Sequence, residues 1–201
     1  MTEHYFSSEP SGPLKTQEIV VRLANTDHTV LTAGGIFSPE HLDAGTEALL
    51  YSSPTPPPTG TFLDIGCGWG PLALTLGIES PEADIWAIDV NTRSVDLTAM
   101  NADRLGLKNI HACKPDEVPQ DLSFDLIWSN PPIRVGKAEL HAILNTWIPR
   151  LKNGGEAYFV VAKHLGADSL EKWLSTTFST SHQVSRADTR KGFRIIRLVK
   201  N

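Results

Sequence analysis

Residues 61–70 of the chain are Thr61-Phe62-Leu63-Asp64-Ile65-Gly66-Cys67-Gly68-Trp69-Gly70. The first half is apolar except for Asp64 and follows a proline-rich turn, which predicts a short buried strand. The second half holds three glycines at alternate positions, and Pro71 follows where the first turn of a helix tolerates proline. Because glycines leave almost no side-chain wall, a ligand can approach this backbone closely at the carboxyl edge of a sheet. The stretch therefore predicts a strand, a ligand-binding turn and a helix.

The spacing of these glycines distinguishes between two kinds of ligand. The dinucleotide fingerprint G-x-G-x-x-G seats a pyrophosphate on a helix N-terminus, but here Pro71 stands where the third glycine is needed. Asp64 would repel a pyrophosphate, whereas its carboxylate suits a cation. S-adenosylmethionine carries a sulfonium and an ammonium group and no phosphate. Asp89 ends the next predicted strand, 19 residues after Gly70, where an acidic residue can bind a ribose diol. We therefore predict S-adenosylmethionine as the ligand, with a tight turn in another α/β protein as the alternative.

From residue 61 onward the pattern alternates between strands and helices, which predicts an α/β fold with a parallel-type sheet covered on both faces. The predicted strands are 61–65, 84–89, 109–113, 124–128 and 155–162, and the predicted helices are 71–79, 92–105, 137–150 and 167–177. Residues 181–185 and 193–199 predict a closing antiparallel strand pair. We expect Asn153-Gly154-Gly155 to terminate the 137–150 helix region.

The chain before residue 59 predicts a small extension of that domain. Residues 1–17 resemble a loosely attached arm, 18–23 and 28–32 predict a hairpin with a turn at 25–27, and 42–51 predict a helix. The stretch Pro54-Thr55-Pro56-Pro57-Pro58 can be an interdomain linker, but we favour a stiff loop, because too little chain precedes it to form a domain. The predicted division is therefore an extension at 1–58 and a ligand-binding catalytic domain at 59–201.

Composition limits the class of protein and its partners. The chain has 201 residues, a net charge of −5 and two cysteines, Cys67 and Cys113, without metal-type spacing. The apolar runs are too short to span a bilayer and the start does not resemble a signal peptide, which predicts a cytoplasmic protein without a membrane segment. The two cysteines predict reduced thiols, with neither a metal site nor a disulfide. Residues 1–129 hold 6 basic and 18 acidic residues, whereas residues 130–201 hold 12 basic and 5 acidic residues. This asymmetry is equally compatible with an anionic partner on one face and with chance segregation of surface charge.

The second motif is Asn130-Pro131-Pro132-Ile133, directly after the predicted strand 124–128. It is expected at the same sheet edge as the glycine loop. Two consecutive prolines remove two N–H donors, so the Asn130 side-chain oxygen and backbone carbonyls are the groups left to face a ligand. Two such acceptors suit a planar NH₂ group, and they can steer its nitrogen lone pair at a methyl donor. The motif predicts methylation of an amine, with a simple proline-rich loop as the alternative.

Together, the two motifs resemble those of class I S-adenosylmethionine-dependent methyltransferases of the amino-methylating type. Further segments resemble the small-subunit (16S) ribosomal RNA guanine-N2 methyltransferases, in a single-domain form: Gly35-Ile36-Phe37-Ser38, Leu42-Asp43-Ala44-Gly45-Thr46, residues 130–137 and Lys191-Gly192-Phe193-Arg194-Ile195. The resemblance covers about residues 5–200. It implies a Rossmann-like seven-stranded, mostly parallel sheet, and a segment from Phe37 to Thr46 that folds over the cofactor.

The site that follows from motifs and resemblance has two groups of residues. The expected catalytic residues are Asn130, Pro131, Pro132 and Ile133. The expected cofactor-binding residues are Asp64, Gly66, Cys67, Gly68, Gly70, Asp89, Val90, Asp116, Asn130, Phe37 and Thr46. Asp116 is the candidate for the acid that binds the adenine amine, and Cys67 is expected to be a small neutral filler rather than a nucleophile.

The sequence departs from the family at two points. The fourth motif position is often aromatic, for stacking on a flipped base, but here it is Ile133, so stacking falls to Phe37 or is weaker. Bacterial ribosomal members often carry a duplicated N-terminal half, which we do not find in this chain. The predicted reaction is methyl transfer to an exocyclic amine, most specifically guanine in ribosomal RNA or the small subunit, by a monomer or weak dimer. The alternatives are methylation of a protein glutamine amide and a cofactor-binding RNA or ribosome assembly module without turnover.

Basic residues give a weaker indication of an RNA-binding surface. Arg134 and Lys137 flank the second motif and are candidates for phosphate contacts. Arg186, Arg190, Lys191, Arg194 and Arg197 gather near the terminal strand pair. The alternative for Arg134 and Lys137 is a solvated loop and helix start. The alternative for the second group is a solvated edge strand.

Overall fold

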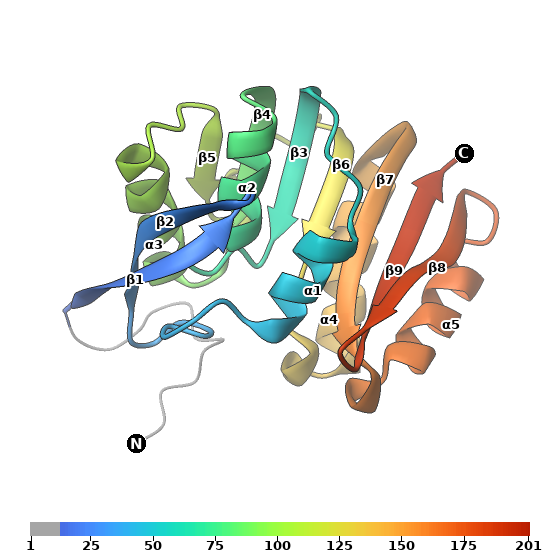
Figure 1. The fold of residues 1–201 in the computed structure, drawn as a ribbon. Helices are drawn as coiled ribbons and strands as arrows, with labels where there is room; N and C mark the ends of the chain where they lie inside the picture. Colours follow the sequence, from blue (N-terminus) through green and yellow to red (C-terminus); the bar gives the residue numbers. More distant parts are fainter. Residues whose placement is uncertain (1–12) are drawn as a thin grey trace.

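The computed structural model of the chain describes residues 13–201. Its centre is a seven-stranded sheet with the order β5-β4-β3-β6-β7-β9-β8 (Figure 1). The strands are β3 (Thr59–Ile65), β4 (Glu82–Ile88), β5 (Ile110–Cys113), β6 (Phe124–Ser129), β7 (Leu151–Ala162), β8 (His182–Arg190) and β9 (Phe193–Lys200). Strands β5, β4, β3, β6 and β7 pair in parallel, whereas β9 runs antiparallel to both β7 and β8. The predicted fold class is confirmed.

Helices cover both faces of this sheet, as its apolar strands require. They are α1 (Ala44–Ser52), α2 (Pro71–Glu79), α3 (Thr92–Arg104), α4 (Lys137–Trp147) and α5 (Ala167–Thr177). In Figure 1, α1 and α2 lie in front of the sheet, and α4 and α5 lie behind it. Successive side chains of a strand point to opposite faces of the sheet. In β6, Leu126 packs on the face covered by α1 and α2, and Ile127 packs on the face covered by α4 and α5.

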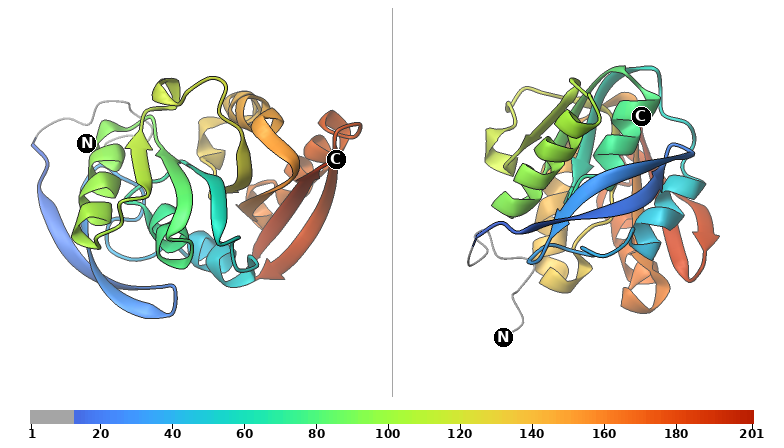
Figure 2. Two further views of the ribbon diagram at one scale, coloured as in Figure 1. Left: turned by 90° about the horizontal axis from the view of Figure 1, so that it is seen from above. Right: turned by 60° about the vertical axis from the view of Figure 1, so that its left-hand side comes forward.

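The N-terminal hairpin is a separate two-stranded sheet of β1 (Thr16–Leu23) and β2 (Thr26–Ala33). It lies outside the central sheet, beside α2 and α3 (Figure 2). It packs on these helices through Val21, Leu23 and Val30. The turn is Ala24–Asn25 rather than 25–27, because both residues adopt positive φ (46° and 63°), as a two-residue type I′ turn requires. Of the predicted lead-in, residues 1–12 lie outside the described residues. The boundary at residue 58 stays a prediction.

Two further boundaries differ from the sequence prediction. Helix α4 ends at Trp147 and a 3₁₀ turn covers Ile148–Arg150, so the helix stops before Asn153-Gly154-Gly155. Those residues instead belong to β7, whose pairing with β6 shifts register between Phe124 and Leu126. The irregularity explains Gly155, where an added Cβ would lie 3.0 Å from the Phe124 carbonyl oxygen. Strand β8 also extends to Arg190, five residues beyond the predicted end.

Candidate functional site

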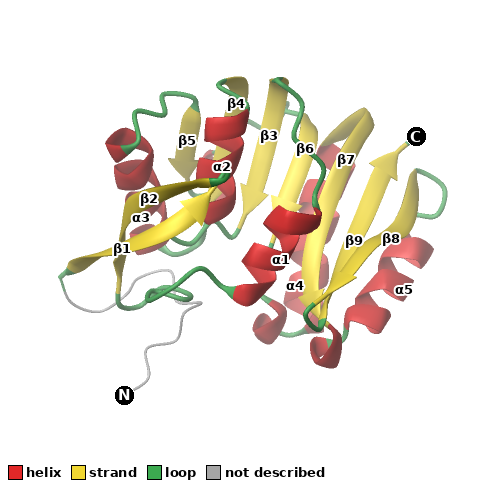
Figure 3. Cartoon of the chain, in the orientation of Figure 1, coloured by secondary structure: helices red, strands yellow, loops and turns green. Residues whose placement is uncertain are grey.

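Three predicted segments meet at the carboxyl edge of the central sheet. Strand β3 lies between β4 and β6, and the chain continues from β3 to β4 and β5 before it returns to β6. The arrowheads of these parallel strands point to one edge (Figure 3). Open α/β sheets bind ligands at the carboxyl edge where the strand order reverses. The glycine loop, Asp89 and Asn130 lie at this position.

The glycine loop needs its glycines for two different reasons. Gly66, Gly68 and Gly70 have φ values of 78°, 59° and 98°, a region that other residues rarely adopt. The N–H of Gly66 donates to the carbonyl oxygen of Ile88 at 2.8 Å, which fixes the loop to β4. A Cβ added to Gly66 or Gly68 would meet no atom within 4 Å, whereas one at Gly70 would lie 3.1 Å from Thr98 Oγ1. The first two glycines therefore border open space, and the third allows close packing on α3.

Asp64 is a buried acid (1% exposed) directly below this loop. Its Oδ2 accepts the N–H of Ala73 at 3.0 Å, so it caps α2 in place of Gly70, which has no side chain. Its Oδ1 is also buried and has no hydrogen-bond partner in residues 13–201. Burial raises the pKa of Asp64 to about 8 against the lowering effect of the Ala73 hydrogen bond. Sequence reasoning missed the capping role, because the helix begins seven residues after Asp64.

Asp89 lies half-buried at the end of β4 and organises the next turn. Its Oδ2 accepts the N–H of Gly68 at 3.1 Å, and its Oδ1 accepts the N–H of Asn91 at 2.9 Å. Burial raises the pKa of this carboxyl group, although both hydrogen bonds oppose the shift. A carboxylate oxygen can accept more than one hydrogen bond, so Asp89 keeps acceptor capacity at the sheet edge.

Three other predicted cofactor residues differ in exposure. Cys67 is buried and its Sγ accepts the Thr98 hydroxyl at 3.4 Å; burial raises the pKa of the thiol, as suits a neutral filler. Val90 is 48% exposed, and its carbonyl oxygen accepts Lys114 Nζ at 2.7 Å. Asp116 is exposed on the 3₁₀ helix Pro115–Glu117 after β5. The adenine-binding role of Asp116 stays a prediction.

The second motif follows β6 as a rigid turn. Ser129, the last residue of β6, donates its hydroxyl to the carbonyl oxygen of Ile65 at 2.7 Å, which ties the ends of β6 and β3 together. The N–H of Ile133 donates to the carbonyl oxygen of buried Pro131 at 2.8 Å. That oxygen therefore has one acceptor position left. The motif thus lies beside the end of the strand that leads into the glycine loop.

The Asn130 side chain is held from the N-terminus of α1. Its Nδ2 donates to Asp43 Oδ2 at 2.8 Å and to Thr46 Oγ1 at 3.0 Å. Thr46, predicted to bind cofactor, is 4% exposed and uses its hydroxyl in this contact. Asp43 was not predicted as a site residue, and its distance of 87 residues from Asn130 leaves no spacing signal.

The two candidates for stacking on a substrate differ in accessibility. Ile133 is partly buried and packs against the core cluster that includes Leu140 and Leu144 of α4. It also lines a small hollow with Leu140 and Val161, between α4 and α5. Phe37 is 51% exposed in the segment between β2 and α1. Of these two side chains, Phe37 presents the larger free surface.

Buried asparagines, which sequence reasoning also missed, tie the N-terminal hairpin to the glycine loop. The Nδ2 of Asn101, on α3, donates to the carbonyl oxygens of Leu31 and Trp69, each at 2.9 Å, and its Oδ1 accepts the N–H of Leu31 at 2.6 Å. Asn91 Nδ2 donates to the Gly35 carbonyl oxygen at 2.9 Å. A polar residue within the apolar face of a predicted helix was the available signal at Asn101.

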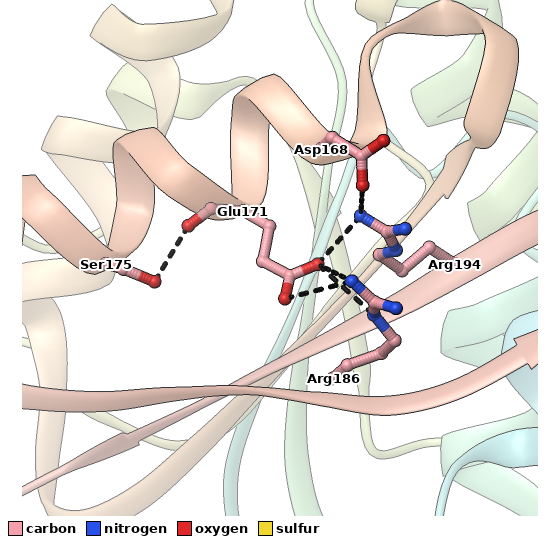
Figure 4. A network of polar contacts seen from close by, with 5 residues as sticks. All are labelled: Asp168, Glu171, Ser175, Arg186 and Arg194. Atoms are coloured by element: carbon pink, nitrogen blue, oxygen red, sulfur yellow. Dashed lines mark hydrogen bonds and ion pairs between the residues drawn. The ribbon is translucent and has the colours of Figure 1, made fainter.

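Much of the basic C-terminal charge is neutralised within the protein. Arg194 is buried and pairs with Asp168 and Glu171 of α5, and Arg186 pairs with Glu171 at 3.1 Å (Figure 4). Arg197 pairs with Glu156 at 2.5 Å. Arg194 therefore ties β9 to α5, and Arg197 ties β9 to β7.

Clusters of metal ligands and membrane-spanning helices are absent from residues 13–201. Within residues 13–201, no group of three or more His, Cys, Asp or Glu side chains is placed to hold a metal ion. None of the helices in that part of the chain combines the length and apolar character needed to cross a bilayer.

Comparison with known proteins gives the family of the chain. Residues 27–197 match the family described as the methyltransferase small domain. The chain belongs to the methyltransferase small domain family. The predicted methyltransferase class is thereby confirmed.

Relatives of this methyltransferase fall into two groups by length. It is 37% identical to the uncharacterized protein YbxB of Bacillus subtilis, over the whole of both chains. It is 30% identical to ribosomal RNA small subunit methyltransferase C of Salmonella typhi, over 84% of this chain and 49% of that one. The chain thus spans about half the length of that ribosomal RNA methyltransferase.

A solved structure has the same fold. The Thermus thermophilus 16S rRNA N2 G1207 methyltransferase, in complex with AdoMet and guanosine, superimposes with a TM-score of 0.81 at 23% identity. The match covers 96% of this methyltransferase and 52% of that protein. At this identity the likeness supports the fold, which agrees with the architecture expected from the sequence.

Proposed function

We propose that this methyltransferase transfers a methyl group from S-adenosylmethionine to an exocyclic amine, and that the amine belongs to guanine in small-subunit ribosomal RNA. The observation that carries the proposal is the orientation of Asn130. Its NH₂ group is engaged by Asp43 and Thr46, so its carbonyl oxygen is the part of the amide left for a ligand. That acceptor lies at the same sheet edge as the glycine loop.

The residues around the glycine loop fit S-adenosylmethionine. The space over Gly66 and Gly68 admits a ligand against the backbone. Asp89 retains acceptor capacity for ribose hydroxyls. The buried Oδ1 of Asp64 is unpaired and suits a cationic ligand, whose charge would lower the raised pKa of that carboxyl group. Exposed Val90 and Asp116 lie at the strand ends beside them, where the adenine would bind. S-adenosylmethionine would supply an electrophilic methyl group whose S–C bond breaks as the new N–C bond forms, the sulfur keeping the electron pair.

The chain itself would supply placement and charge stabilisation. Asn130 Oδ1 and the remaining acceptor position of Pro131 O would each take one N–H of a planar amine, which directs the nitrogen lone pair at the methyl carbon. As positive charge develops on that nitrogen, the same oxygens stabilise it, and the nitrogen then loses one proton to water. Pro132 stiffens the turn, and Ile133 closes it through the hydrogen bond to Pro131.

The choice of guanine in ribosomal RNA rests on relatives. The Salmonella typhi relative is named as a small-subunit ribosomal RNA methyltransferase, and the Thermus protein as an N2 methyltransferase of G1207. Exposed Phe37 is available to stack on an unpaired base. The cytoplasmic location and the monomeric or weakly dimeric state stay predictions.

Transfer of labelled methyl groups tests this proposal. The protein is incubated with labelled S-adenosylmethionine and, separately, naked total RNA, small ribosomal subunits and a protein fraction, all from cells that lack it. Label in N2-methylguanosine after nucleoside digestion supports the proposal. Label in glutamine of the protein fraction would replace it with amide methylation. Cofactor binding without transfer to any fraction would favour the assembly module.

A further inference from the structure

The N-terminus of α1 and the second motif share one hydrogen-bonded cluster. Asp43 Oδ2 accepts the N–H groups of Gly45 and Thr46 at 2.8 and 3.0 Å, which caps α1, and it also accepts Asn130 Nδ2 at 2.8 Å. Thr46 Oγ1 accepts the same Nδ2 at 3.0 Å. Both N–H bonds of the Asn130 amide are therefore directed at two oxygens of the α1 N-terminus.

The chemistry of Asp43 decides which way the Asn130 amide points. A carboxylate offers acceptors only, so the amide must present NH₂ and not its oxygen to Asp43. Rotation of the amide by 180° would place its oxygen against the Asp43 carboxylate and lose that hydrogen bond, whereas the Thr46 hydroxyl can accept from NH₂ or donate to the amide oxygen. The orientation that leaves the Asn130 oxygen free for a ligand is thus imposed by Asp43.

The packing around this cluster holds Asp43 in place. A Cβ added to Gly45 would lie 2.9 Å from Asp43 Oδ2 and 3.1 Å from the ring of Phe193, so the close approach depends on glycine. Thr46 is buried, and Ala48 and Leu49 of the same helix belong to the core that faces β7. Asp43 is therefore carried by a helix that is fixed against the central sheet.

We propose, on the basis of the proposed methyl transfer, that Asp43 and Thr46 are positioning residues that orient and polarise the Asn130 amide for the methyl-accepting amine. The negative charge beside the NH₂ group shifts electron density toward Asn130 Oδ1, which strengthens that oxygen as an acceptor. The effect is largest where the accepting nitrogen becomes positive, so it favours the transition state over the bound substrate. Asp43 is not expected to touch the cofactor or the amine.

Two substitutions separate this role from simple capping of α1. D43S keeps a good capping residue, but the shorter side chain cannot reach Asn130. D43N keeps a good cap and an oxygen that can accept from Asn130 Nδ2.

We expect D43S to lower kcat by about 100-fold with KM and cofactor Kd little changed, since a small misplacement of a reacting group costs about that much. D43N should recover at least about tenfold of that loss, and the melting temperatures of both should stay close to wild type. Equal kcat for D43S and wild type would overturn the proposal. A loss in D43N as large as in D43S would overturn orientation by the hydrogen bond and leave the negative charge of Asp43 as the cause.

Thr46 provides a second test if position 43 proves intolerant. T46V removes the hydroxyl and retains the shape, whereas T46S retains the hydroxyl. We expect a lower kcat for T46V than for T46S, with an unchanged KM for the methyl-accepting substrate. Identical kcat values for the two variants would remove Thr46 from the proposal.

The side-chain amide of Asn130 can also be observed without any reaction. Its two protons are assigned in ¹H–¹⁵N spectra by their loss in N130A. In D43S they should exchange with water about ten to 100 times faster than in wild type, as loss of a hydrogen bond to a charged group predicts. Unchanged exchange would overturn the anchoring itself. If wild type transfers no methyl group but this exchange changes as expected, the proposed function fails and the anchoring stands.

Discussion

The two halves of the candidate site are built from different distances along the chain. The glycine-loop half (residues 64–70 and 89–91) is joined by contacts between neighbouring β–α units, such as Gly68 N–H to Asp89, 21 residues apart. The Asn130 half (residues 130–133 with 43–46) depends on contacts that span 87 and 84 residues. The first half is fixed by its own strand-turn-helix sequence. The second requires α1 to dock on the completed sheet, so its geometry depends on the whole fold.

The largest expected effect is on the rate of methyl transfer, from a substitution that changes only the Asn130 half. N130A should lower the rate of methyl transfer by roughly 1,000-fold, because the amine loses both an orienting acceptor and the charge stabilisation that it provides. The Kd for S-adenosylmethionine should change little, since the glycine loop is untouched. Single-turnover kinetics and calorimetry measure the two quantities. N145A, on the exposed side of α4, is the matched control. An active N130A protein would contradict the orienting mechanism.

What could be predicted from the sequence follows the same division. The strand 61–65, the glycine loop and Asp89 were predictable because strand periodicity and glycine placement are local signals. The parallel order of the sheet followed from the alternation of strands and helices. The contacts of Asp43 with Asn130 and of Asn101 with Leu31 were not predictable, because they join residues 87 and 70 positions apart. The glycine stop expected at Asn153-Gly154-Gly155 was wrong, because Gly154 resembles a helix stop but lies in β7.

The next effect concerns the buried acid of the glycine-loop half. Burial raises the pKa of Asp64 to about 8 from an ordinary value of 3.8. Between these values the folded protein binds a proton that the unfolded chain does not, so the free energy of unfolding falls as pH rises. The slope is about 1.4 kcal/mol per pH unit, or about 3 kcal/mol between pH 5 and pH 7. D64N removes this titration and should show a correspondingly flatter profile in urea unfolding.

The control for this measurement is D121N, which alters an exposed acid. Its unfolding free energy should follow the wild-type pH dependence. Parallel profiles for wild type and D64N would show that Asp64 is already ionised in the folded protein, and that its capping of α2 carries the full charge.

A smaller effect is expected at Asp89, in binding rather than stability. D89A removes the acceptor for ribose hydroxyls and the hydrogen bond to Gly68 N–H. We expect the Kd for S-adenosylmethionine to rise by about 10 to 100-fold, which is the range for loss of hydrogen bonds to a charged group. Calorimetric titration measures the change, with D96A on the exposed side of α3 as the control. An unaltered Kd would remove Asp89 from the ribose role and leave the glycine loop as the main binding element.

The smallest expected effect concerns the basic side chains beside the Asn130 half, which are candidates for contacts with RNA phosphates. Arg186, Arg194 and Arg197 are held by carboxylates, which leaves them little free charge for phosphate. Arg134 and Lys137 are exposed and form no ion pair within residues 13–201. Lys137 also begins α4, where a positive charge opposes the helix dipole, so local stability does not account for it.

Phosphate contacts at Arg134 and Lys137 would appear in the salt dependence of activity on RNA. Each contact adds about −0.7 to −1 to the slope of log(kcat/KM) against log salt concentration. R134A/K137A should therefore flatten the slope by roughly 1.4 to 2, whereas K108A, at a remote ion pair with Asp103, should leave it unchanged. An unchanged slope in the double variant would place the RNA contacts elsewhere. A flat wild-type slope would favour chance segregation of charge and weaken the case for an RNA substrate, while the effects of N130A and D89A would still test the two halves of the site.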